Sequence, residues 1–173
     1  MEIRKTKLLY YSPTGTGKTT VTAIMNGTGL DHDVIDLTQP DSIKNYEVSS
    51  DELAIIAAPV YSGRISTVAA NRIKKLKGNK TPAVLVVMYG NRAFEDALLE
   101  LKNLTRELGF KAIAGAAFIG QHSFNSEKTP IATGRPDAED LMIAEVFGEK
   151  IMEKLRRVGD IPELEVPGNY PYV

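Results

Sequence analysis

Short apolar runs alternate with helix-like patterns along most of the chain. The apolar runs are KLLYY (7–11), DVIDL (33–37), LAIIAA (53–58), AVLVVMY (83–89) and AIAGAAFIG (112–120). Continuous apolar runs of this length, bounded by polar segments, are typical of parallel strands that are covered on both faces. The pattern therefore predicts an α/β fold in which five parallel strands form one sheet with helices on both of its faces.

Two longer segments have the spacing of amphipathic helices. Apolar residues recur at three- and four-residue steps from Phe94 to Leu108 and from Leu141 to Leu155. Gly109 is a helix stop, and Pro136 with the acidic residues after it is typical of a helix start. A shorter helix should follow the first strand and end at NGTG, residues 26–29.

The end of the chain has a different composition. GDIPELEVPGNYPYV, residues 159–173, contains three prolines and two glycines, which disfavour further helix or strand. We therefore expect a domain at residues 1–158 followed by an extended C-terminal tail at 159–173.

Composition excludes several classes of function. The 173 residues are enough for one domain, and 21 basic against 22 acidic residues leave a net charge of -1, which argues against nucleic acid or an anionic membrane as a partner. The chain has no cysteine, so any redox chemistry needs a cofactor. His32 and His122 lack metal-ligand spacing. Because no apolar run is long enough to cross a bilayer and no secretory signal is present, we expect a cytoplasmic protein.

The loop after the first strand, within YYSPTGTGKTTVT (10–22), can be interpreted in two ways. A triphosphate P-loop needs a glycine five residues before Gly-Lys-Thr, but Ser12 stands there. The strand LAIIAAPVY also lacks the aspartate that would hold magnesium. A single phosphate needs less: backbone N–H groups at a helix N-terminus and nearby hydroxyl groups suffice.

TGTGKT resembles the flavodoxin phosphate signature, Ser/Thr-x-Thr-Gly-x-Thr, which in that family holds the phosphate of flavin mononucleotide (FMN). In one register Thr14, Thr16 and Thr19 supply the hydroxyls, with Gly17 as the glycine and Lys18 at the variable place. In a second register, SPTGTG, residues Ser12, Thr14 and Gly15 match and Gly17 replaces the last threonine. Both registers remain open, and both imply the same ligand.

Two further loops should meet the first, because ligands in doubly wound sheets bind beyond the carboxyl ends of the strands. PVYSGRIS (59–66) follows the third strand and YGNRAFED (89–96) follows the fourth. Tyrosine offers a face for a flavin ring, and glycine brings backbone polar groups close to it. The candidate residues are Pro59, Val60, Tyr61, Ser62, Gly63, Arg64, Tyr89, Gly90, Asn91 and Arg92. The alternative is that the tyrosines are half-buried strand ends.

The resemblance covers nearly the whole chain. PVYSGRIS, KGNKTPAVLVVMYGNRAFEDALLEL, FIGQHSF and GRPDAEDL look like the flavodoxin module of flavodoxin/ferredoxin fusion proteins. It implies a flavodoxin-like, doubly wound sheet with strand order 2-1-3-4-5, bound FMN, and electron transfer. In those fusions a cysteine-rich ferredoxin part follows a tail like VPGNYPY, and this chain ends at Val173. The expected redox partner is therefore a ferredoxin or another iron-sulfur protein on a separate chain; the alternative is that the chain is a standalone or truncated form.

Three other functions remain as alternatives. They are a flavin-dependent NAD(P)H or quinone reductase, a P-loop nucleotide-binding protein, and a scaffold that has lost its cofactor. For a reductase, the long polar segment GQHSFNSEKTPIATGR (120–135) could help to form a substrate site, with His122 and Phe124 over the outer edge of the ring.

Two hypotheses concern how the protein tunes a bound flavin. In flavodoxins a peptide after the third strand can turn to bond the half-reduced ring, which suggests the carbonyl of Ser62 or Gly63 here. Arg64 and Arg92 could raise the reduction potential by lying near the ring, or they could point to solvent or pair with Glu95 and Asp96.

Overall fold

Five parallel strands form the central sheet of the computed structural model, which describes residues 2–40, 44–157, 159 and 161–173. The strands are β1 (Lys5–Tyr10), β2 (His32–Asp36), β4 (Glu52–Tyr61), β7 (Thr81–Tyr89) and β8 (Phe110–Ile119). Their order across the sheet is β2-β1-β4-β7-β8, and all neighbours pair in parallel. The predicted order 2-1-3-4-5 is confirmed. Residue 158, the predicted domain end, lies outside the described residues.

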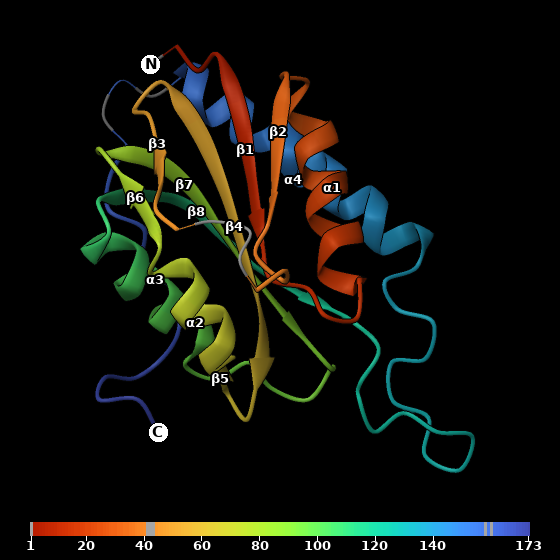
Figure 1. Ribbon diagram of the computed structural model, residues 1–173. Helices are drawn as coiled ribbons and strands as arrows, with labels where there is room; N and C mark the ends of the chain where they lie inside the picture. Colours follow the sequence, from red (N-terminus) through yellow and green to blue (C-terminus); the bar gives the residue numbers. More distant parts are fainter. Residues whose placement is uncertain (1, 41–43, 158, 160) are drawn as a thin grey trace.

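Helices cover both faces of this sheet (Figure 1). One face carries α1 (Thr16–Thr28) and α4 (Ala138–Arg157), and the other carries α2 (Thr67–Ile73) and α3 (Ala97–Glu107). Because successive strand residues point to opposite faces, Leu8 packs in the α1/α4 layer and Leu9 in the α2/α3 layer. This two-sided burial explains why the strands β4 and β7 have nearly continuous apolar sequences.

The sequence pattern did not predict several short strands. β3 (Tyr46–Val48) and β6 (Leu76–Gly78) form a separate two-stranded parallel sheet, and β5 (Arg64–Ile65) pairs antiparallel with the end of β4. Strands of two or three residues are too short to show a period. The hydroxyl of Thr81 donates to the carbonyl of Val48 at 2.6 Å, which links the small sheet to β7.

The first helix ends within NGTG, as predicted. α1 continues through residues 26–28 and ends at Thr28, and Gly29 follows as its C-cap with a left-handed φ of 66°. Gly27 stays in the helix because it faces the backbone of α4: a Cβ on Gly27 would lie 1.9 Å from the carbonyl oxygen of Glu145.

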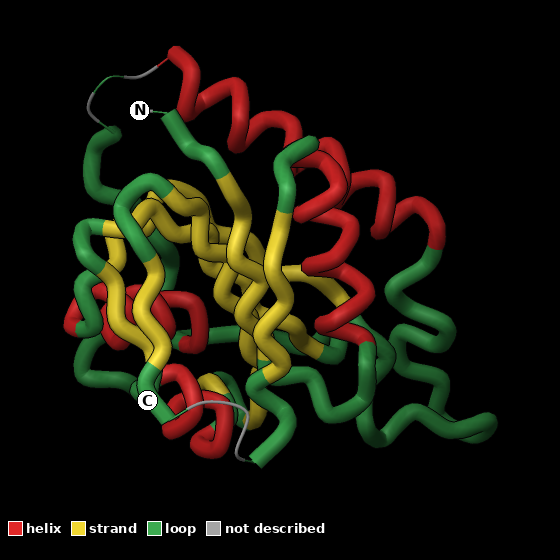
Figure 2. The backbone as a smooth tube through the Cα atoms, turned by 45° about the horizontal axis from the view of Figure 1, so that its top comes forward, coloured by secondary structure: helices red, strands yellow, loops and turns green. Residues whose placement is uncertain are grey.

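The connection from β8 to α4 is the longest stretch of the described chain without helix or strand, and it projects from the end of the sheet (Figure 2). The side chain of Asn125 organises it, because its Oδ1 accepts from the N–H of Ile131 at 2.8 Å and from the hydroxyl of Thr133 at 2.6 Å. The two ends are joined where the N–H of Gln121 donates to the carbonyl of Arg135 at 2.9 Å. The segment is thus a closed, internally bonded loop.

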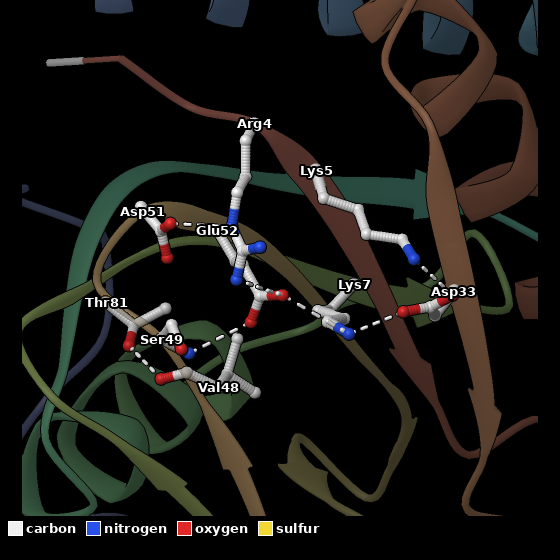
Figure 3. Close-up of polar contacts among 9 residues, drawn as sticks. All are labelled: Arg4, Lys5, Lys7, Asp33, Val48, Ser49, Asp51, Glu52 and Thr81. Atoms are coloured by element: carbon white, nitrogen blue, oxygen red, sulfur yellow. Dashed lines mark hydrogen bonds and ion pairs between the residues drawn. The ribbon is translucent and has the colours of Figure 1, made fainter.

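A charged cluster lies at the opposite end of the sheet, where β1, β2 and β4 begin (Figure 3). Lys7 bridges two acids: its Nζ bonds to Asp33 and lies 3.3 Å from Oε1 of Glu52. Glu52 also accepts from the N–H of Ser49 at 3.0 Å. The side chains of Lys7 and Glu52 are 12% and 7% exposed, so the pair is largely withdrawn from water.

This cluster predicts how stability depends on acidity. Hydrogen bonds from Lys5 and Lys7 lower the pKa of Asp33 from 3.8 to about 2. A carboxyl whose pKa is depressed by folding stabilises the protein above its unfolded pKa and loses that effect as the pH falls through the folded pKa. The free energy of unfolding of the wild type should therefore exceed that of Asp33→Asn at neutral pH, and the difference should shrink between about pH 4 and pH 2. Urea unfolding at a series of pH values measures this difference, and a constant difference would contradict the assignment.

Candidate functional site

A cleft opens at the carboxyl ends of the strands, where the chain order reverses between β1 and β4. It is lined by Tyr11, Ser12, Pro13, Thr14, Thr16, Gly17, Ala57, Pro59, Val60, Tyr61, Met88, Tyr89, Gly90, Gly120, Gln121, His122 and Ser123. These residues come from the loops and strand ends after β1, β4, β7 and β8. This is the switch point at which doubly wound sheets bind ligands.

The cleft gathers part of the predicted site. Among the residues proposed from sequence, Ser12, Thr14, Thr16, Gly17, Pro59, Val60, Tyr61, Tyr89 and Gly90 line it. Gly15, Lys18, Thr19, Ser62, Gly63, Arg64, Asn91 and Arg92 lie outside its lining. The residues of the lining that were not proposed for the flavin site are Tyr11, Pro13, Ala57, Met88, Gly120, Gln121, His122 and Ser123, although the segment 120–135 with His122 was proposed for a substrate site. The position of this segment in the chain could have identified it as a wall of the cleft. It follows the fifth strand and therefore lies at the same end of the sheet as the other three loops.

The loop after β1 prepares a place for an anion. The N–H of Gly15 donates to the carbonyl of Ser12 at 3.2 Å, and Gly15 has a left-handed φ of 82° that turns the chain into α1. The hydroxyls of Thr14 and Thr16 lie 3.1 Å apart on this turn. The N-cap residue of α1, Gly15, has no side chain that could cap the helix, and the first turn has no acidic residue. The positive end of the helix dipole therefore faces a loop rich in hydroxyl groups.

The two threonines at either end of the signature have different surroundings. Thr14 lines the cleft, whereas the hydroxyl of Thr19 donates back to the carbonyl of Gly15 at 3.1 Å. Ser12 also lines the cleft, and its Oγ accepts from the N–H of Lys18 at 3.0 Å. This arrangement favours the register that begins at Ser12. It does not favour a triphosphate loop, because the exposed Lys18 lies outside the lining.

The loop after β4 is a tight hairpin turn. Ser62 and Gly63 have φ values of 51° and 76°, and they connect the paired residues Tyr61 and Arg64. Positive φ at both central residues is the mark of a two-residue type I′ turn. The carbonyl of Gly63 accepts from the N–H of Asp96 at 3.0 Å, so the carbonyl of Ser62 is the better candidate for an acceptor near a ligand.

Arg64 is held away from the cleft by an acid that sequence reasoning did not choose. Its Nε and Nη2 donate to the two carboxylate oxygens of Glu100 at 2.8 and 2.7 Å. This hydrogen bonding raises the pKa of Arg64. The hydrogen-bonded carboxylate partner of Arg64 is therefore Glu100 on α3, while Asp96 adds a weaker electrostatic attraction. Arg92 is exposed and outside the lining.

The loops after β7 and β8 pack against each other. Gly90 lies so close to His122 that a Cβ on Gly90 would be 2.3 Å from its Cδ2. The Nδ1 of His122 accepts from the N–H of Phe124 at 3.0 Å, so the neutral ring carries its proton on Nε2. Tyr89 packs edge-on against Phe94 with ring centroids 5.4 Å apart, and Phe124 is 77% exposed. The tyrosine is thus half-buried, as the alternative interpretation held, and also part of the cleft wall.

The donors in the cleft suit a phosphate joined to a planar ring. None of the described residues that line it has a carboxylate, ammonium or guanidinium group. Hydroxyls and a helix N-terminus occupy one end, while Tyr61, Tyr89 and Met88 provide aromatic and apolar surface. Burial raises the pKa of Tyr61, so this phenol stays neutral at physiological pH. The residue types therefore fit FMN.

Comparisons with known proteins agree on the fold. No protein-family model matches the chain, and no curated protein matches it. An archaeal flavodoxin is similar in structure at 17% identity and a TM-score of 0.54, over 88% of this chain and 99% of its own. Flavodoxin 1 from Bacillus cereus is similar at 12% identity and a TM-score of 0.60, over 90% of this chain and 99% of its own. The chain has a flavodoxin-like fold.

Larger proteins contain a similar region. Rubredoxin oxygen:oxidoreductase from Desulfovibrio gigas is similar at 12% identity and a TM-score of 0.60 over 90% of this chain, which spans 37% of that protein. At these identities the likeness shows the flavodoxin-like fold alone. The likeness to the module of a flavodoxin/ferredoxin fusion stays a prediction. In the described part of this flavodoxin-like chain, no helix has the length and apolarity to span a bilayer.

Proposed function

We propose that this flavodoxin-like protein binds FMN non-covalently and transfers electrons between other proteins. The observation that carries the proposal is the cleft at the switch point, which combines a hydroxyl-rich helix start with aromatic walls and has no carboxylate, ammonium or guanidinium group in its described lining. Flavodoxin-like structural neighbours support it through the fold.

Each part of the cleft has a distinct role in this proposal. Ser12, Thr14 and Thr16 bind the phosphate together with the first backbone N–H groups of α1. Tyr61 and Tyr89 contact the ring. Bound FMN supplies reversible one- and two-electron chemistry, which the side chains of this cysteine-free chain cannot supply.

The proposed partner is a ferredoxin or another iron-sulfur protein on a separate chain. The balanced charge of this protein, 21 basic against 22 acidic residues, means that recognition depends on local shape and apolar contact more than on long-range attraction. Exposed aromatic side chains lie at and beside the cleft: Tyr61 is 52% exposed and Phe124 is 77% exposed. They offer a contact surface of that kind.

The phosphate role of Thr14 predicts a selective loss of affinity. Thr14→Val removes a hydroxyl that can donate to the phosphate, so FMN binding should weaken roughly 10- to 100-fold, since hydrogen bonds to charged groups contribute ~1.5–3 kcal/mol. Riboflavin, which lacks the phosphate, should bind equally well to the wild type and the variant. Fluorescence titration of both flavins measures this.

Thr19→Val is the matched control for this titration, because the hydroxyl of Thr19 is bonded within α1 and outside the cleft lining. It should leave FMN affinity nearly unchanged. Both registers include Thr14, so a loss at Thr19 as well as at Thr14 would select the register that begins at Thr14. Failure of the wild-type protein to bind FMN at all would overturn the proposed function.

A reductase remains the second candidate, because residues 121–123 form a wall of the cleft that could also contact a small substrate. Stepwise anaerobic reduction of the FMN-loaded protein separates the two functions. A carrier should pass through a one-electron-reduced form and should need a reduced iron-sulfur protein as donor. Rapid bleaching by NADPH alone would favour the reductase.

A further inference from the structure

Hydrogen bonds hold the turn after β4 against the N-terminal end of α3. The C-terminal segment is hydrogen-bonded to the same end of this helix. Glu100 of α3 binds the guanidinium of Arg64 and also accepts from the N–H of Ile65 at 3.0 Å. Asp96, which precedes α3, donates its N–H to the carbonyl of Gly63 at 3.0 Å. The ends of the Ser62–Gly63 turn are thus held by two residues of one helix start.

We propose that residues 169–173 position this turn, and with it the wall of the FMN cleft, with Tyr172 as the principal positioning residue. The inference rests on the proposed function for its ligand. Figure 1 shows the C-terminus beside α2 and β5, far along the chain from the turn but adjacent to it in space. Two sets of contacts make the connection.

The first set of contacts converges on the carboxylate of Asp96, which is 1% exposed. Its Oδ2 accepts from the N–H of Val173 at 2.8 Å and its Oδ1 from the N–H of Asn169 at 2.7 Å. These hydrogen bonds lower the pKa of Asp96, so the carboxylate stays ionised and bound at neutral pH. The same residue therefore anchors the tail by its side chain and the turn by its backbone.

The second contact is a stack on Arg64. The guanidinium carbon of Arg64 lies 4.3 Å from the ring centroid of Tyr172, and the hydroxyl of Tyr172 accepts from Nδ2 of Asn103 on α3 at 2.9 Å. Arg64 is thus fixed by the carboxylate of Glu100 and also covered by an aromatic ring. A planar guanidinium held in this way has little freedom, which restricts the backbone that carries it.

Displacement of this turn changes the cleft because Tyr61 directly precedes it. Tyr61 lines the cleft and pairs with Arg64 across the hairpin, so movement of Arg64 is passed to Tyr61. The carbonyl of Ser62 moves with the same turn. The tail therefore acts on the ligand through Arg64 and Tyr61, without contributing to the described lining of the cleft.

The experiment compares Tyr172→Ala with Tyr172→Phe, which keeps the ring over Arg64 and loses only the hydroxyl. Tyr170→Ala is the control for the tail, because Tyr170 is 77% exposed and its ring packs on Tyr172, while the ring over Arg64 is that of Tyr172. Amide hydrogen exchange of Ile65 and Asp96 is measured without flavin, and FMN affinity and midpoint potential are measured with it.

In Tyr172→Ala, exchange of the Ile65 amide should accelerate and FMN should bind about three- to tenfold more weakly, with a shifted potential, as expected for loss of one cation–π contact. Tyr172→Phe and Tyr170→Ala should stay close to the wild type. Unchanged exchange and affinity in Tyr172→Ala would overturn the inference, and so would equal losses in all three variants, which would indicate general loosening of the tail. If the wild type does not bind FMN, the proposed function fails separately, and the exchange measurement still decides whether the tail holds the turn.

Discussion

Gly148→Ala is expected to lower the free energy of unfolding by about 2 kcal/mol, although alanine is the better helix former. Gly148 lies in the middle of α4, where a Cβ would be 2.0 Å from the carbonyl oxygen of Ile24 and 3.0 Å from Cα of Gly27 in α1. Backbone atoms cannot rotate away as a side chain can. The two helices must separate, and the buried residues between them, including Ile24 and Ala144, lose contact.

The matched comparison uses the next residue, Glu149, which is exposed on the same helix. There Glu149→Ala should be more stable than Glu149→Gly by about 1 kcal/mol, the ordinary difference in helix propensity. If replacing glycine by alanine lowers the free energy of unfolding at position 148 but raises it at position 149, then close contact between the helices, and not helix propensity, decides the effect at position 148. Thermal and urea unfolding measure both pairs; equal or greater stability of Gly148→Ala would contradict the close packing.

Lys7→Met should also destabilise the protein strongly, by about 2–4 kcal/mol, because it leaves the carboxylate of Glu52 buried without its nearest cation. Methionine fills a similar volume, so the loss reports the missing charge more than a cavity. Glu52 keeps the N–H of Ser49 and the more distant Arg4, whose Nη2 is 3.7 Å away. These remaining contacts place the expected loss toward the lower part of the range for broken buried pairs.

Two further variants separate charge from packing at this cluster. Adding Glu52→Gln to Lys7→Met should restore much of the stability, because the buried carboxylate is then removed as well. Lys77→Met breaks the exposed pair between Lys77 and Glu47, each 72% exposed, and should hardly change stability. Urea unfolding measures all of them, and equal losses for Lys7→Met with and without Glu52→Gln would mean that the charge of Glu52 is not the cause.

The strands and longer helices were predictable because their buried residues follow a regular pattern in the sequence. β4 and β7 are nearly continuous in apolar residues, since both of their faces are covered, and α3 and α4 show a regular apolar stripe. The short elements were not predictable for the opposite reason. β3 and β6 have three residues each, and they exist because each pairs with the other and Thr81 bonds to Val48.

The candidate site was likewise predictable from the sequence only in part. The three predicted loops meet because parallel strands end at one edge of the sheet, and this follows from strand order. Which side chains turn inward does not follow from it. Thr19 lies in the same signature as Thr14 but bonds along its helix, and Arg64 turns to Glu100, a residue 36 positions away.

The sequence by itself determined the α/β class, the strand order through its resemblance to flavodoxins, and the loops that form the cleft. These depend on local period, on residue type and on rules of chain connection. The tertiary structure alone decided the close approach of Gly27 and Gly148 and the contact of Tyr172 with Arg64. Each of these contacts joins segments that are distant in sequence. The packing of the whole sheet and its helices sets the distances between such segments, and a local sequence pattern does not contain these distances.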